Sequence, residues 1–166
     1  FHETGWQSET SFAVSEQGMT SVPFFSIITP VFNPPINAFR DCAASVAQQT
    51  CNDWEWILVD DGSTDPEVID VLNFIEMNPR VTVIRREKNG GIVAASNDGI
   101  NAARGQFIAL LDHDDQLTPD ALATVQELLI ANSDVDYVYS DEDKVNEDGH
   151  FFDRFRKPRF SPERLR

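Results

Sequence analysis

The sequence lacks several features that would assign it to a class at once. It has no run of about 20 apolar residues, which is the length that a helix needs to cross a bilayer, and no charged stretch followed by an apolar run near its start. Only two cysteines occur, Cys42 and Cys51, so neither a disulfide framework nor a zinc set is expected. We therefore expect a cytoplasmic protein without a transmembrane segment. Cys42 falls on an apolar helical face, which predicts a buried free thiol.

Positive charge is also scarce. The 166 residues include 13 Lys and Arg against 28 Asp and Glu, a formal net charge of −15. Because nucleic-acid phosphates attract positive surfaces, this balance excludes a general nucleic-acid binder. Six of the 13 basic residues lie between Arg154 and Arg166, so the rest of the chain is more acidic still. Clustered carboxylates suit a divalent cation, although a solubilising acidic surface is the simpler account of most of these charges.

Three well-known motifs are absent as well. There is no Gly-X-X-X-X-Gly-Lys phosphate loop and no Gly-X-Gly-X-X-Gly after the first apolar run, which excludes the common nucleoside triphosphate and dinucleotide folds. No Gly-X-Ser-X-Gly turn indicates a serine hydrolase. With 166 residues the chain is long enough for one domain with a core, and too short for two.

From Phe24 onward, apolar runs alternate with segments of helical periodicity. The predicted strands are Phe24–Val31, Trp54–Asp60, Val81–Ile84, Gln106–Leu111 and Val135–Ser140. The predicted helices run from Ile36 to about Gln49, from Pro66, from Gly91 to about Ala103, and from Thr118-Pro119 to about Ala131. Strands that are apolar on both faces and alternate with helices predict an α/β fold, with a mostly parallel, Rossmann-like sheet and helices on both faces. Residues 1–22 show no clear period and are expected to be a linker or a poorly ordered lead-in.

In such a sheet, ligands bind outside the carboxyl ends of the strands. The segment Asp112-His113-Asp114 follows one predicted strand. Residues i and i+2 of an extended segment point the same way, so both carboxylates can face one divalent ion. A simple turn before Thr118 is the alternative, because Asp often begins turns.

The other strand ends are polar too. Asp65 or Thr64 is expected to cap the helix at Pro66, which leaves Asp60 and Asp61 without a structural reason. One of these carboxylates can accept a hydrogen bond from the N–H of a base or from ribose hydroxyls. The turn Asn89-Gly90-Gly91 either lets the backbone approach a ligand or merely joins a strand to a helix.

Taken together, four ordered motifs resemble family 2 glycosyltransferases with the GT-A fold. They are Ser26–Asn33, Val59–Asp65, Asn89–Gly91 followed by Ala94, Ala95, Asn97 and Gly99, and Leu111–Asp115. Two later segments, Tyr139–Lys144 and Lys157–Pro162, resemble bacterial polysaccharide and rhamnosyl-type transferases. The resemblance implies a nucleotide-sugar-binding GT-A domain at residues 23–152, and in residues 153–166 a basic segment that starts an incomplete acceptor-binding part.

The resemblance also implies residue roles. Asp61 would bind the base, Asp112 would lie near the ribose and diphosphate and join Asp114 as a ligand of Mn²⁺ or Mg²⁺, and Asp141 or Asp143 would approach the donor sugar or the acceptor. No catalytic base is assigned. The remaining residues expected to line the nucleotide-sugar site are Pro30, Val31, Phe32, Asn33, Asn89, Gly91, Asn97 and His113.

The activity implied is that of an inverting glycosyltransferase in bacterial cell-surface polysaccharide synthesis. It would move a sugar from a UDP- or dTDP-sugar to a hydroxyl of a saccharide or lipid-linked acceptor. A sugar-nucleotide-binding fragment without turnover is one alternative. A nucleotidyltransferase is another, disfavoured because Pro30–Pro35 has neither glycine nor positive charge. The basic segment either lies against its own domain or contacts the inner face of a membrane; Pro158 and Pro162 interrupt any amphipathic helix, which favours the first role.

Overall fold

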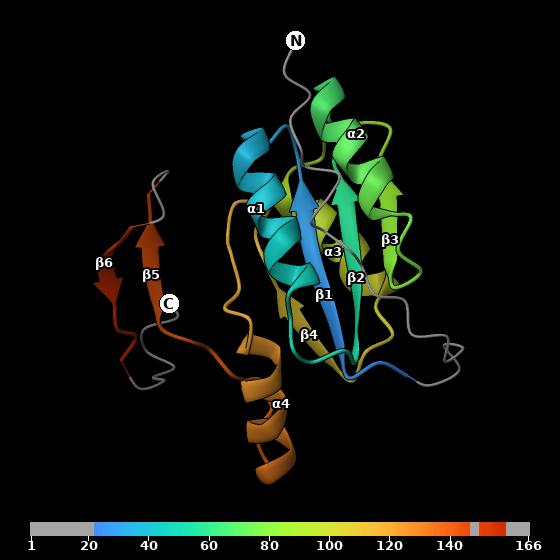
Figure 1. Cartoon of the computed structure of the whole chain (residues 1–166). Helices are drawn as coiled ribbons and strands as arrows, with labels where there is room; N and C mark the ends of the chain where they lie inside the picture. Colours follow the sequence, from blue (N-terminus) through green and yellow to red (C-terminus); the bar gives the residue numbers. More distant parts are fainter. Residues whose placement is uncertain (1–21, 147–149, 159–166) are drawn as a thin grey trace. The chain divides into compact units, whose positions relative to one another are not determined.

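The computed structural model describes residues 22–146 and 150–158 (Figure 1). Two compact units form within the chain, Phe1–Glu127 and Leu128–Arg166. The predicted lead-in lies outside the described residues except for Val22, and so do residues 159–166 of the predicted basic segment.

The first unit is built on a four-stranded parallel sheet, which confirms the predicted α/β fold. The strand order is β3-β2-β1-β4. The strands are β1 (Phe25–Val31), β2 (Trp54–Asp60), β3 (Val81–Arg85) and β4 (Phe107–Leu110). β1 and β2 lie in the middle and are buried along almost their whole length. β3 and β4 are only partly buried, although both are rich in apolar residues. Each has one neighbouring strand in the described part of the chain, and a side chain on an edge strand is covered on fewer sides.

Helices cover both faces of the sheet, as expected. α1 (Ile36–Ala47) and α2 (Pro66–Ile75) lie on one face, and α3 (Ile92–Ala102) lies on the other (Figure 1). α2 begins at Pro66, and the Asp65 side chain caps it by accepting from Glu67 N at 2.9 Å, which confirms that prediction.

Gly99 permits α3 to approach the sheet closely. It is buried in the helix interior, where a Cβ would lie 2.5 Å from Ile28 Cγ2 and 3.2 Å from Val59 Cγ2. Glycine in a helix costs about 1 kcal/mol relative to alanine. The contact of the α3 backbone with β1 and β2 side chains explains why the residue is needed here.

The predicted fifth strand at 135–140 is wrong. These residues form no strand, and Tyr137 is 67% exposed. Asp136 interrupts the apolar run, so the segment has no side chains for a strand that is buried on both faces. The second unit instead contains an antiparallel pair, β5 (Glu142–Val145) and β6 (Phe151–Phe155). The predicted domain boundary between residues 152 and 153 falls inside β6.

The predicted start of the fourth helix also needs correction. α4 spans Ala121–Ala131, so it begins three residues after Thr118. The chain first makes a turn in which Ala121 N donates to Thr118 O at 3.0 Å. Thr118 O also accepts from the side chain of Gln49 at 2.7 Å, and this tertiary contact holds the residue outside the helix.

Cys42 and Cys51 are both buried and free, which confirms the prediction for Cys42. Among the described residues, no helix is both long enough and apolar enough to span a bilayer.

A buried carboxylate ties β1, β2 and the start of β4 together. Glu55, 4% exposed on β2, accepts from Ser26 Oγ at 2.6 Å and from Arg104 N at 2.7 Å. Arg104 also donates to it through Nε and an η nitrogen at 2.9 and 2.6 Å. Burial raises the pKa of Glu55, but the hydrogen bonds from Ser26 and Arg104 outweigh it and lower the pKa below 4.5. The carboxylate is therefore ionised in the folded protein at neutral pH.

We expect Glu55→Gln to lower the free energy of unfolding by about 2 kcal/mol, the scale of hydrogen bonds to a charged group. The folded-state pKa lies below the ordinary value, so this contribution is complete above pH 4.5 and is lost as the pH falls through the folded pKa. Denaturant unfolding at neutral pH and below pH 4.5 measures it. The control is Glu76→Gln, whose partly exposed pair with Arg85 contributes less than about 1 kcal/mol. A pH-independent cost for Glu55→Gln would contradict the assignment.

Candidate functional site

The carboxyl ends of the four parallel strands share one edge of the sheet (Figure 1). Most predicted site residues of the first unit lie in the loops that follow the strands, whereas Pro30 and Val31 lie in β1 and Asn97 lies in α3. β1 leads to Phe32 and Asn33, β2 to Asp61, β3 to Arg86 and β4 to Asp112. The sheet topology therefore brings the four sequence motifs to one edge, although up to about 80 residues separate them along the chain.

The turn after β1 is joined to the loop after β2 by Asn33. Its Oδ1 accepts from Thr64 N at 2.9 Å and from Asp65 N at 3.0 Å, and its backbone N donates to Ser63 Oγ at 3.1 Å. Its φ of 43° is a left-handed conformation that asparagine tolerates better than most residues. The Asn33 side chain is thus occupied in holding two loops together.

The residues around Asn33 differ in what they offer a ligand. Val31 is 1% exposed and lies in the core, so its side chain does not face the solvent at the strand ends. Phe32 is 47% exposed directly after β1. A flat aromatic ring in this position can pack against a planar base.

Asp61 is the most constrained carboxylate at this edge. It is 3% exposed and accepts from Gly90 N at 2.9 Å and from Gly91 N at 2.8 Å. Arg86 donates to it at 2.6 Å and bridges to Asp98 at 3.0 Å. Burial raises the pKa of Asp61, but these hydrogen bonds and the guanidinium charge lower it below 3.8. Asp61 is an ionised acceptor with fixed orientation.

The neighbour Asp60 has a local structural role, because its side chain accepts from Ser63 N at 2.8 Å. Helix capping explained neither aspartate from the sequence, and Arg86 was not among the predicted site residues. The available signal was a basic residue directly after a strand, opposite an acidic pair.

Glycine geometry shapes the loop that holds Asp61. Gly91 has φ 84° and ψ 165°, a region that is nearly confined to glycine. This conformation turns its N–H toward Asp61 and starts α3 one residue later. Asn89 supports the turn by accepting from Gly91 N at 3.2 Å, while Asn97 is exposed on α3.

Asp112 and Asp114 follow β4 and are both exposed. Neither carboxylate has a hydrogen bond or an ion pair with another residue of the described ranges 22–146 and 150–158. Between them, His113 Nδ1 lies 3.0 Å from Pro30 O, so the ring is fixed as a donor to a carbonyl. His113 is therefore tied to β1, and the two aspartates beside it are left to the solvent.

The Cys42 thiol lies beneath this acidic segment. It is fully buried on α1 and donates to Asp112 O at 3.6 Å. Burial, and then the charges of Asp115, Asp114 and Asp112, raise its pKa to about 12. The thiol stays protonated at neutral pH, so it is a donor to the loop and not a thiolate ligand.

The donor set fits a hard divalent ion that is shared with a ligand. In the part of the chain that the structure describes, no group of three or more His, Cys, Asp or Glu side chains forms a metal cage. Asp112 and Asp114 offer carboxylate oxygens only, which is the chemistry preferred by Mg²⁺ and Mn²⁺. Such ions commonly take one or two carboxylates from the protein and further oxygens from phosphates and water.

The second unit places its acidic residues in ion pairs. Asp141 accepts from Arg156 at 2.8 Å and from Lys157 N at 2.8 Å. Asp143 pairs with Arg154 at 3.6 Å. The hydrogen bond from Arg156, and then that from Lys157 N, lower the pKa of Asp141. The basic segment therefore pairs with its own acidic strand in the described residues.

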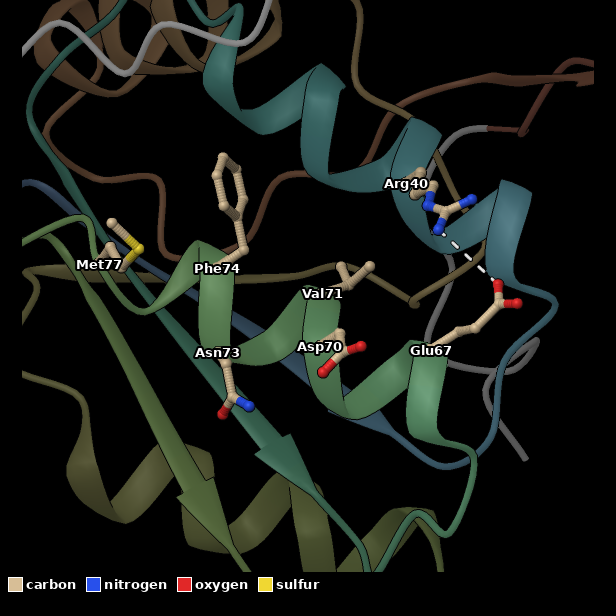
Figure 2. Close-up of a pocket in the computed structure, with 7 residues that line it drawn as sticks. All are labelled: Arg40, Glu67, Asp70, Val71, Asn73, Phe74 and Met77. Carbon is tan, nitrogen blue, oxygen red and sulfur yellow. Dashed lines mark ion pairs between the residues drawn. The ribbon is translucent and has the colours of Figure 1, made fainter. Parts of the chain in front are cut away.

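A pocket of about 450 Å³ opens between α1 and α2 (Figure 2). An ion pair of 3.7 Å between Arg40 and Glu67 crosses it. Its lining residues are Arg40, Glu67, Asp70, Val71, Asn73, Phe74 and Met77. None of them belongs to a loop that follows a strand of the sheet, so this pocket is separate from the acidic edge.

The chain belongs to glycosyl transferase family 2, whose family model matches residues 26–165. Among its relatives, protein y4gI of Sinorhizobium fredii is 45% identical over 144 residues. The O-antigen biosynthesis protein RfbC of Myxococcus xanthus is 39% identical over 145 residues, and a hyaluronan synthase of Pasteurella multocida 34% over 154. These alignments cover 86%, 87% and 92% of this chain but only 16%, 11% and 16% of the three relatives. The chain therefore spans less than a fifth of their length.

Solved structures agree with the fold. S. aureus TarS 1-349 in complex with UDP-GlcNAc is 25% identical, with a TM-score of 0.61 over 66% of this chain and 32% of that chain. A mannosyltransferase, PcManGT from Pyrobaculum calidifontis, in complex with GDP-Man and Mn²⁺, gives a TM-score of 0.57 at 23% identity over 66% of this chain and 33% of that chain. The fold is thus the GT-A type expected from the sequence.

We expect Asp61→Asn to lower the free energy of unfolding by about 2–4 kcal/mol, because an amide cannot replace a buried charge that holds Arg86 and two backbone N–H groups. Amide exchange at Gly90 and Gly91 should accelerate at the same time. Asp65→Asn is the matched control in the same loop; it should change stability by less than about 0.5 kcal/mol because asparagine caps helices as well as aspartate. Equal effects of the two substitutions would show that Asp61 does not hold this loop.

Proposed function

We propose that this chain binds the nucleoside diphosphate of a UDP- or dTDP-sugar at the carboxyl edge of the sheet, for transfer of the sugar to an acceptor hydroxyl with inversion. The observation that carries the proposal is the pair of exposed carboxylates, Asp112 and Asp114, that have no partner among the described residues. Two adjacent anionic groups without a counter-charge repel one another, and a cation held between them removes that cost. Membership of glycosyl transferase family 2 supports the choice of ligand.

Asp112 and Asp114 would hold Mn²⁺ or Mg²⁺ together with the diphosphate. A bound ion of this kind supplies positive charge to the negative charge that develops on the leaving diphosphate. The contribution of the chain is to present two carboxylates on a loop that Leu111 N fixes to Ile28 O at 3.1 Å and that the His113 ring fixes to Pro30 O at 3.0 Å.

The nucleotide end of the donor is assigned to Asp61 and Phe32. An ionised carboxylate only accepts hydrogen bonds, so Asp61 selects a base edge or a ribose that presents a donor. Its two oxygens are already oriented by Gly90, Gly91 and Arg86, so binding does not need to order them. TarS, which has the same fold, was solved in complex with UDP-GlcNAc, and this supports a uridine-type donor.

Transfer itself requires an acceptor hydroxyl to attack the anomeric carbon on the face opposite the diphosphate, helped by a general base. One displacement of this kind inverts the stereochemistry. Asp141 is a poor base because Arg156 and the Lys157 backbone lower its pKa, so we assign no catalytic base within the described residues. Donor binding without transfer is therefore the second candidate function of this chain. An assay that detects metal-dependent donor binding but no glycosylated product would favour it.

The names of two relatives, an O-antigen biosynthesis protein and a hyaluronan synthase, support a role in cell-surface polysaccharide synthesis, with a saccharide or a lipid-linked sugar as acceptor. We place the reaction in the cytoplasm, with residues 153–158 of the basic segment paired within their own unit. The ion pairs of Arg154 and Arg156 with Asp143 and Asp141 support this arrangement, because they neutralise charge that an anionic bilayer would otherwise attract.

Asp114→Ala should remove most of the gain in UDP affinity that Mn²⁺ provides, while leaving the melting temperature within about 2 °C because the side chain is exposed. Calorimetric titration of UDP with Mn²⁺ and with EDTA measures the gain. The control, Asp70→Ala, removes an exposed carboxylate of α2 and should leave the gain intact. If the unsubstituted chain binds UDP equally with EDTA and with Mn²⁺, the metal assignment is wrong.

For Asp61→Asn, UDP binding should weaken by about 1–3 kcal/mol, and by the same amount with Mn²⁺ as with EDTA, because this carboxylate is assigned to the base or ribose and not to the ion. The same pair of titrations separates the two roles. A variant that keeps its metal-free affinity but no longer responds to Mn²⁺ would reverse the assignments of Asp61 and Asp114.

A further inference from the structure

Three buried polar side chains form a polar row in the C-terminal half of α1 and just beyond it. They are Cys42 and Ser45, three residues apart on one side of the helix, and Gln49, two residues after the helix ends. They are 0%, 7% and 6% exposed. A buried polar group is retained only when it has hydrogen-bond partners, so their partners indicate what the row does.

The partners lie in the segment between β4 and α4 and in the first turn of α4. Ser45 Oγ accepts from Leu117 N at 3.1 Å. Gln49 Nε2 donates to Thr118 O at 2.7 Å, and Gln49 Oε1 accepts from Leu122 N at 3.0 Å. The next residue of the chain adds a backbone bond, from Thr50 N to Pro119 O at 2.8 Å.

This segment depends on such bonds because it has no regular helical or sheet hydrogen bonds of its own. Residues 111–120 belong to no helix or strand. Their upstream end is fixed by the bond from Leu111 N to Ile28 O and by the Cys42 thiol at Asp112 O. Their downstream end is fixed by Ser45 and Gln49. Asp114 lies between these two anchors.

We propose that Ser45 and Gln49 are positioning residues for the metal-binding carboxylates: they hold the downstream end of the segment that presents Asp112 and Asp114. The inference rests on the proposed function, and it adds residues from a different element of the fold. A segment held at both ends samples fewer conformations than one held at a single end, so less freedom is lost when its carboxylates close on an ion. The polar row therefore fixes the position of the two carboxylates and does not contact the ion, as outer-shell partners of metal ligands do.

Gln48 and Gln49 provide a matched pair for the test. Both are glutamines at the end of α1, but Gln48 is exposed and Gln49 is buried against the segment. We expect Gln49→Ala to reduce the Mn²⁺-dependent gain in UDP affinity about 10-fold, the lower end of the range for outer-shell partners. UDP affinity in EDTA should stay unchanged, because Asp61 and Phe32 lie in other loops. Gln48→Ala should change neither affinity.

Two further readouts keep the test independent of folding and of activity. Ser45→Ala removes the acceptor of Leu117 N together with a bond inside α1, from Ser45 Oγ to Cys42 O, and should reproduce the effect in weaker form. Amide exchange at Leu117 and Leu122 should accelerate in Gln49→Ala without Mn²⁺ or UDP present, while exchange at Gly90 and Gly91 stays slow. A merely structural role of Gln49 would instead lower UDP affinity equally with and without the ion.

The outcomes separate the inference from the proposed function. If the unsubstituted chain responds to Mn²⁺ and Gln49→Ala and Ser45→Ala respond as strongly, the positioning role is overturned and the proposed function stands. If Mn²⁺ does not raise the UDP affinity of the unsubstituted chain, the proposed function and the positioning role are both overturned, whatever the amide exchange rates are. A selective loss of the Mn²⁺ response with faster exchange at Leu117 and Leu122 supports both.

Discussion

Repulsion between carboxylates is the constraint on which the acidic edge of the sheet depends. Parallel topology places Asp60 and Asp61 at the carboxyl end of β2 and Asp112 and Asp114 after β4, on either side of β1. The two pairs are treated differently. Asp60 and Asp61 are buried and satisfied by backbone N–H groups and Arg86. Asp112 and Asp114 remain exposed, and neither carboxylate has a partner among the described residues.

The two pairs of aspartates also differ in how firmly their loops are held. The loop around Asp61 is fixed by bonds within the protein, including the glycine conformation at Gly91. The loop around Asp114 is fixed at its two ends and open in the middle. Under the proposed function, this arrangement would give the donor a preformed acceptor for its nucleoside and adjustable charges for its diphosphate. The polar row connects two parts of the first unit: Ser45 of α1 and Gln49 just beyond it hold the segment that follows β4.

The sequence predicted the elements whose patterns are local. β1, β2 and α2 were identified because apolar runs, helical spacing and the Asp65-Pro66 start are short-range signals. The strand expected at 135–140 does not form, because Asp136 interrupts the apolar run and gives the segment mixed polarity. The antiparallel pair β5–β6 was missed, although Asp148-Gly149 is a dipeptide typical of tight turns. The candidate ligands Asp112 and Asp114 were selected for the same local reason, since their i, i+2 spacing is visible in three consecutive residues.

The bonds that set the environment of each site residue could not be predicted in the same way. Asp61 meets Arg86 and Gly90 across 25 and 29 residues, and Gln49 meets Thr118 across 69. No periodicity carries such pairs, because they depend on which loops the sheet order brings together. Burial cannot be read from a motif either: Val31 is expected to line the nucleotide-sugar site, and its side chain is 1% exposed.

The strand order has a kinetic consequence for how this edge is assembled. β1, β2 and β3 pair in sequence order, so the chain up to Arg85 can form three neighbouring strands through short crossovers. β4 instead pairs with β1, and their partners Phe25 and Phe107 are separated by more than 80 residues. The entropy cost of closing a loop rises with its length, so the pairing of β4 with β1 is expected to form more slowly than the pairings among β1, β2 and β3. During synthesis from the N-terminus, the Asp61 loop can therefore form while β4 is still absent, and the acidic segment after β4 is the last part of the edge to be completed.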